Sequence, residues 1–152
     1  MKLTLQTQLF PDKEQAEMLK ETLRSFNEAC SWLSEKAFEH KCSNKVELQK
    51  MFYYELREKF NLSAQMAVRA IAQTMEANKR DKSICPKFRE LAAMPFDQRM
   101  MSFKDVDKVS LLTLQKRIVV PFVAGNIKRK NSLTPKDNPI WFSASETANG
   151  FC

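Results

Sequence analysis

Glycine and histidine are nearly absent from this sequence of 152 residues, which contains two glycines and one histidine. Gly125 and Gly150 are isolated, so the chain cannot form the glycine-rich phosphate loop of Walker-type or dinucleotide-binding proteins. His40 has no second imidazole with which to share a metal ion, and any triad chemistry would depend on this residue alone. We therefore expect His40 to be an exposed residue near a helix end, and we predict no catalytic residue, metal site or cofactor.

Closely spaced cysteines and long apolar runs are also missing. Cys30, Cys42, Cys85 and Cys152 include no pair at the two-residue spacing of zinc ribbons and redox dithiols. The longest apolar run, residues 118–124, is far shorter than the roughly 20 residues that span a bilayer. The N-terminus lacks the continuous apolar segment of a signal peptide. We expect a soluble, cytoplasmic protein with reduced thiols and no membrane partner.

Positive charge is the strongest feature of the composition. The chain has 25 Lys and Arg against 18 Asp and Glu, a formal net charge of +7. Residues 81–131 hold 11 basic and 5 acidic side chains, whereas residues 1–43 hold 6 and 7. Such an excess is typical of proteins that contact a phosphate backbone, and the alternative is a positive, solvated surface without a ligand.

Three amphipathic helices are predicted between residues 12 and 80. Asp12 and Gln15 form a capping-box signature, which precedes apolar residues at spacings of three and four. A second capping box begins at Asn44, and Ser63 can cap the third helix. Short loops between the helices predict an antiparallel bundle.

Strand patterns lie on both sides of the helical region. Residues 2–10 alternate between polar and apolar side chains, and three later segments have strand-like patterns: 100–104, 108–114 and 117–122. A lone strand is not stable, so the first strand should pair with the later ones.

The predicted fold is therefore α+β, with a small antiparallel β-barrel or sandwich into which a three-helix bundle is inserted after the first strand. Residues 1–11 and 81–124 should form the β part, and residues 12–80 the helical lobe. The polar composition of residues 125–152 predicts a poorly ordered tail.

Five segments also carry, in this order, residues typical of one protein family. They are Lys2–Pro11 with Gln15, the helical stripe ending at Trp32–Leu33, Phe60–Gln65, Val109–Leu111, and Arg117–Phe122. Over residues 1 to about 125 the chain resembles the N-terminal part of the OrfB/TnpB proteins of bacterial transposons.

The resemblance implies a wedge-like β-barrel with an inserted helical recognition lobe. It also implies a role in transposition and DNA recombination, since the family consists of transposon-encoded, RNA-guided DNA endonucleases. In such proteins a guide RNA reads the target by base pairing, and the protein reads a short flanking DNA motif. DNA and a structured guide RNA are thus the expected partners.

The sequence departs from the family at its far end. Family members continue into a RuvC-like nuclease domain with three acidic metal ligands and a zinc ribbon, neither of which is found here. Asp105 and Asp107 are closely spaced, but we expect them to form a turn between strands rather than hold metal ions. We expect a truncated member that binds nucleic acid without a catalytic domain of its own.

The predicted DNA contacts lie in and near the third helix. Gln65, Arg69 and Gln73 are four residues apart and share one helix face, from which Gln can pair with adenine and Arg with guanine. The resemblance places Gln65 against the flanking DNA duplex, with Asn61 and Ser63 as its neighbours. The alternative is the ordinary polar face of an amphipathic helix.

Two further groups complete the predicted interface. Tyr53 and Tyr54 lie beside Lys50 and Arg57, where a ring could stack on a base and the cations could pair with phosphates. The predicted RNA contacts are cations expected at strand ends and turns: Lys87, Arg89, Arg99, Lys104, Lys108, Lys116 and Arg117.

A rival interpretation is that the helical bundle is a protein-docking or dimerisation module and that the positive charge is incidental. This interpretation allows the chain to associate with itself.

Overall fold

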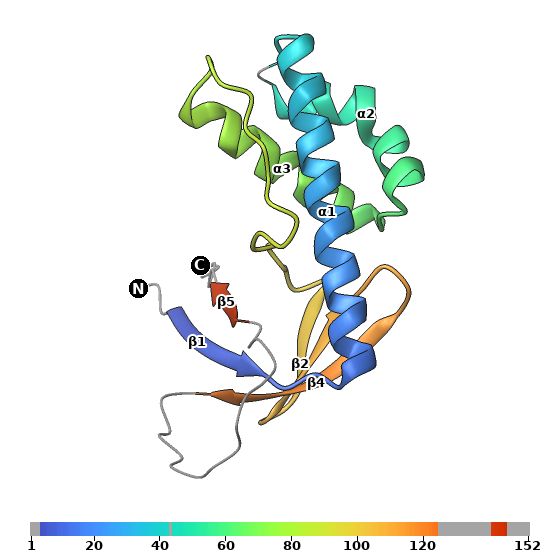
Figure 1. Ribbon diagram of the computed structural model, residues 1–152, viewed down its shortest axis with the longest axis vertical. Helices are drawn as coiled ribbons and strands as arrows, with labels where there is room; N and C mark the ends of the chain where they lie inside the picture. The colour runs from blue at the N-terminus through green and yellow to red at the C-terminus, as the bar shows by residue number, and fades with distance from the viewer. Residues whose placement is uncertain (1–3, 43, 125–140, 146–152) are drawn as a thin grey trace, which may run out of the picture. The chain divides into compact units, whose positions relative to one another are not determined.

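The computed structural model describes residues 4–42, 44–124 and 141–145, and its fold is α+β (Figure 1). Strand β1 comprises Thr4–Leu9, and three helices follow it: α1 (Lys13–Glu39), α2 (Lys45–Phe60) and α3 (Ala64–Arg80). Four strands come after the helices: β2 (Met101–Asp105), β3 (Lys108–Leu112), β4 (Arg117–Ala124) and β5 (Trp141–Ser145). The predicted order of strand, three helices and further strands is confirmed.

The chain divides into two compact units. The sheet unit comprises residues 1–16, 96–112 and 117–152, and the helical unit comprises residues 17–95 and 113–116. The predicted helical lobe ends at residue 80, whereas the contacts of the next fifteen residues group them with the helices.

The sheet unit is an antiparallel sheet with the strand order β2-β3-β4-β1-β5. Residues 117–121 of β4 pair with β3, and residues 122–124 pair with β1. On its other edge, β1 pairs with β5 over residues 4–8. The first strand thus pairs with strands from the far end of the sequence, as predicted.

The predicted β-barrel is wrong, because the described strands form an open sheet with β2 and β5 at its two edges. A barrel closes only when the stagger of its strands brings the two edges together. Here β1 begins to pair with β4 only where β3 stops, so the two sides of the sheet are displaced along β4. In the part of β4 that β1 does not reach, the carbonyl of Val119 accepts a hydrogen bond from Gln15 Nε2 at 3.0 Å.

Residues 141–145 fall within the predicted tail but form strand β5. This strand supplies partners for backbone groups of β1 that would otherwise lie on an open edge. The remainder of the predicted tail, residues 125–140 and 146–152, lies outside the described residues.

The predicted N-caps of α2 and α3, Asn44 and Ser63, are confirmed. The Asn44 side chain accepts a hydrogen bond from Val46 N at 3.0 Å, and Ser63 Oγ accepts one from Met66 N at 3.3 Å. At the start of α1, Gln15 Oε1 accepts a hydrogen bond from Asp12 N at 3.1 Å. These bonds satisfy amide groups that a helix start leaves without partners.

Helix α1 packs against the other two helices through different sides. Trp32 meets Phe52 of α2 edge-on, with ring centroids 5.8 Å apart, and Ser25 Oγ donates to the carbonyl of Phe60 at 2.8 Å. Toward α3, Thr74 Oγ1 donates to the carbonyl of Cys30 at 3.4 Å. These contacts make α2 antiparallel to α1, and the C-terminal ends of α1 and α3 lie at the same end of the helical unit (Figure 1).

Residues 85–92, here named the strap, run antiparallel along α1 and include a turn at residues 90 and 91, where Ala92 N donates to the Arg89 carbonyl at 3.0 Å. Ser31 Oγ accepts a hydrogen bond from Phe88 N at 3.1 Å. One turn earlier on α1, the buried Asn27 Nδ2 lies 3.0 Å from both the Glu90 and Ala92 carbonyls. Polar side chains of one helix thus hold a segment that has no regular secondary structure.

Candidate nucleic-acid interface

Tyr53, Tyr54 and Arg57 form an aromatic–cation cluster on α2. The inner side of α2 buries Leu48, Phe52 and Leu56, which leaves Tyr54 on the outer side with 74% of its surface exposed. The two tyrosine rings have centroids 5.2 Å apart and meet at 80°. The Arg57 guanidinium lies 5.6 Å from the centre of the Tyr53 ring.

The cluster has the two components that recognise unpaired nucleotides. An exposed ring offers a face on which any base can stack, and a nearby cation can contact a phosphate or the base itself. Arg57 Nε also donates to the Leu62 carbonyl at 3.4 Å, which holds the guanidinium beside the ring. Because α2 carries three glutamates as well as four cations, stacking rather than net charge would dominate binding here.

The α3 residues predicted to contact DNA are less accessible. Gln65, Arg69 and Gln73 are all half-buried, and Gln73 Nε2 lies 3.5 Å from the carbonyl of Ala93. Gln65 and Arg69 are each already engaged in an interaction. A major-groove helix must project its polar side chains freely, so α2 offers the more open surface.

The turn between α2 and α3 contains the other two predicted DNA contacts. Asn61 is exposed and has a left-handed backbone conformation, with φ of 51°, and its N–H donates to the Arg57 carbonyl. The Ser63 hydroxyl is engaged as the cap of α3. Asn61 is therefore the more available of the two.

The seven predicted RNA-contact cations are all exposed but do not form one patch within either unit. In the helical unit, Lys87 and Arg89 lie on the strap on either side of Phe88, and Lys116 lies on the short link before β4.

In the sheet unit, the cations lie at opposite ends of the strands. Both β2 and β4 are antiparallel to β3, so Arg99 and Arg117 occupy the same end, where Arg117 Nη2 donates to the Arg99 carbonyl at 2.6 Å. Lys104 and Lys108 flank the turn at the other end, roughly 15 Å away along the strands. The sheet thus carries two separate cationic ends.

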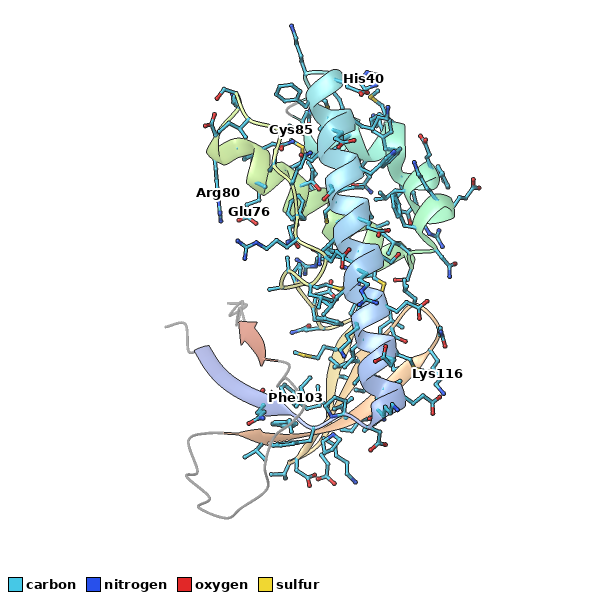
Figure 2. The ribbon with its side chains drawn as sticks, in the orientation of Figure 1. His40, Glu76, Arg80, Cys85, Phe103 and Lys116 are labelled. Carbon is cyan, nitrogen blue, oxygen red and sulfur yellow. The ribbon has the colours of Figure 1, made fainter. Side chains whose placement is uncertain are left out.

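Asp105 stabilises the turn between β2 and β3, and His40 lies against an aromatic ring of α2. Asp105 Oδ1 accepts a hydrogen bond from Val106 N at 2.8 Å, and the chain turns at Val106 and Asp107, as predicted. Within the described ranges, no group of three or more His, Cys, Asp or Glu side chains could hold a metal ion. His40 is exposed at the end of α1, with its ring 5.6 Å from that of Phe52 (Figure 2).

The three described cysteines are free thiols, and their environments differ. Cys30 lies on α1 and is buried, and burial raises the pKa of its thiol to about 12, although a side-chain hydrogen bond with Thr74 acts in the opposite direction. Because the thiolate is the reactive form, Cys30 is inert at neutral pH. Cys42 and Cys85 are half-buried.

None of the helices in the described part of the chain is long and apolar enough to cross a membrane. Comparisons with family models, curated proteins and solved structures found no match for the chain.

Proposed function

We propose that this chain is a nucleic-acid-binding protein and that the aromatic–cation cluster on α2 stacks on unpaired bases. The observation that carries the proposal is the exposure of Tyr54 beside Tyr53, with the Arg57 guanidinium over the neighbouring ring. Stacking of the Tyr54 ring on a base would remove its apolar face from water, while the guanidinium contacts the backbone of the nucleic acid.

The proposal includes a relationship to the N-terminal part of the OrfB/TnpB family, with guide RNA and a flanking DNA motif as partners. It is supported by the order of one strand, three helices and further strands, and by the return of β1 to the later strands. The exposed cations at the two ends of the sheet and on the strap supply phosphate contacts in this proposal.

The first test measures binding of the full chain to single-stranded DNA, duplex DNA and structured RNA over a range of salt concentrations. Each phosphate contact releases counterions, so affinity should fall steeply between low and moderate salt, by about tenfold or more for several contacts. An affinity that does not change with salt contradicts the proposal.

The second test separates stacking from charge at the cluster. Tyr54→Ala should weaken binding to single-stranded nucleic acid by about tenfold, because one base–ring stack is worth about 1–3 kcal/mol. Tyr54→Phe keeps the ring and should bind like the unchanged chain. Val119→Ala, at a residue that is 43% exposed in the middle of the sheet, between its two cationic ends, is the control for a surface change elsewhere. Equal binding by all three variants would exclude the cluster as the contact surface.

A second candidate function is protein docking through the same outer side of α2. Val46 and Met51 are 57% and 50% exposed there, and tyrosine and arginine are enriched at the centres of protein interfaces. Sedimentation of the purified chain at two concentrations distinguishes the functions, since a dimerisation module assembles without nucleic acid.

A further inference from the structure

A groove at one end of the helical unit is not part of the proposed nucleic-acid surface. It has a volume of about 440 Å³ and lies between the C-terminal ends of α1 and α3 and the segment that follows α3. In Figure 2, Arg80 marks the end of α3 and His40 the end of α1. The volume suits a few side chains or a small ligand.

The floor and walls of the groove are apolar. Ala37 and Met75 are almost fully buried beneath it. Phe38 and Ile84 line it with 49% and 62% of their surfaces exposed, although both are large apolar side chains. Exposed apolar surface that is grouped in a groove is typical of a binding site rather than of scattered surface residues.

The rim of the groove is cationic. Lys41, Lys79 and Lys82 line it, and no carboxylate of a described residue lies within 4.0 Å of their ammonium groups. Among the described residues that line the groove, Asp81 is the one acidic residue, and it is engaged by Ser83, whose N and Oγ lie 2.9 and 2.6 Å from Asp81 Oδ1. The rim therefore favours a ligand with negative charge.

Lys41 has a strained backbone conformation. Its φ is 50°, a left-handed conformation that glycine adopts readily and that other residues adopt with strain. The turn is closed by a hydrogen bond from Cys42 N to the Ala37 carbonyl at 2.9 Å. A lysine at this position gives up local stability but places a cation on the rim, and strain of this kind is concentrated at functional sites.

The surroundings favour an acidic peptide over a nucleic acid. Helix α3 ends at Asp81 in an extended conformation, and no hydrogen bond within the described residues caps its last carbonyls. These carbonyls can accept hydrogen bonds from the N–H groups of a peptide backbone, whereas the phosphate backbone of DNA has no such donors. The chain's own residues 125–140 contain four basic side chains and one acidic one, so their charge does not complement the rim.

We propose that this groove, with its apolar floor and its rim of Lys41, Lys79 and Lys82, binds a partner-protein segment in which apolar anchor residues are flanked by Asp and Glu. The apolar side chains occupy the space beside Phe38 and Ile84, and the flanking carboxylates pair with the lysines. This interaction is independent of the nucleic-acid surface on α2.

The test uses the full chain and a labelled short peptide in which a Leu-Phe pair is flanked by runs of Asp and Glu. Fluorescence anisotropy should detect binding that is lost when Leu-Phe is replaced by Ser-Ser and when the acidic runs are replaced by lysines. Single-stranded DNA and oleate serve as competitors, and displacement of the peptide by either one at comparable concentration would assign the groove to that ligand and overturn the proposal.

Two variants with different effects on folding connect binding to the rim. Lys82→Glu lies beyond the end of α3 and should weaken peptide binding by about fivefold or more. Lys41→Gly should weaken binding by about threefold while raising the midpoint of urea denaturation, so its loss of binding cannot come from unfolding. Lys50→Glu, at an exposed position outside the groove, is the matched control and should bind normally. The proposal fails if the peptide does not bind, or if all three variants bind it equally.

Discussion

Two residues of the described chain other than glycine have positive φ, and they differ in how well they tolerate it. Lys41 has φ of 50° and Asn61 has φ of 51°. Asparagine is enriched in this conformation, whereas the lysine Cβ crowds the backbone. Lys41→Gly should therefore raise the free energy of unfolding by about 0.5–1 kcal/mol, after allowance for the greater entropy of an unfolded glycine. Urea denaturation measures this, with Asn61→Gly as the comparison expected to show a smaller gain, and a loss of stability in Lys41→Gly would contradict the strain.

Cys30 makes the stability of the fold depend on pH in the alkaline range. Burial raises the pKa of its thiol from 9.0 to about 12, so above pH 9 the unfolded chain releases a proton that the folded chain retains. The contribution of this group is complete below pH 9 and is lost as pH rises toward 12, by up to about 1.4 kcal/mol per pH unit. Urea denaturation between pH 8 and 10.5 should show that the unchanged chain loses this contribution to its free energy of unfolding as pH rises, whereas Cys30→Ala does not. Parallel pH profiles would show that Cys30 does not titrate in this way.

At the scale of elements, the helices could be predicted from the sequence because their signals are local. The caps at Asn44 and Ser63 and the spacing of apolar residues depend only on neighbours along the chain. The strap has no such signal, because it is held by side chains of α1 about sixty residues earlier. The groove was missed for a related reason, since Phe38 and Ile84 approach each other only after α1 and α3 end side by side.

The strap depends on Asn27 more than on its other contacts. The fully buried Asn27 amide has two N–H donors and lies 3.0 Å from two strap carbonyls, those of Glu90 and Ala92, and 2.9 Å from the Leu23 carbonyl of its own helix. Asn27→Leu keeps the volume but leaves these carbonyls without their donor, which should cost about 1–3 kcal/mol. Ser31→Ala removes the weaker contacts with Phe88 and should cost about 1 kcal/mol or less. Urea denaturation and hydrogen exchange at strap amides measure both, and unchanged exchange in Asn27→Leu would contradict this role.

At the scale of the whole molecule, the pairing of the first strand with the last ones was predictable, but the closure of the sheet was not. Pairing follows from the need of β1 for partners, which the sequence places after the helices. Closure depends on how far the strands are staggered, and the offset along β4 is set by where β1 and β3 begin and end. The antiparallel pairing of β2 and β4 with β3 places the sheet cations at two ends, a distribution that a count of lysines and arginines does not reveal.

Strand β1 is the element on which the long-range order of the sheet depends, because it alone joins β4 to β5 among the described strands. Gln8 lies opposite Val123 on one side and Trp141 on the other, so its backbone is in the interior of the sheet. Gln8→Pro removes an N–H from the ladder and introduces a ring between paired strands, which should cost about 3 kcal/mol or more. Gln8→Thr keeps the N–H and favours a strand, so it should change stability by less than about 0.5 kcal/mol. Hydrogen exchange of the β1, β4 and β5 amides, measured beside urea denaturation, should show loss of protection in Gln8→Pro alone, and protection retained in that variant would mean that β1 is not held in the sheet as described.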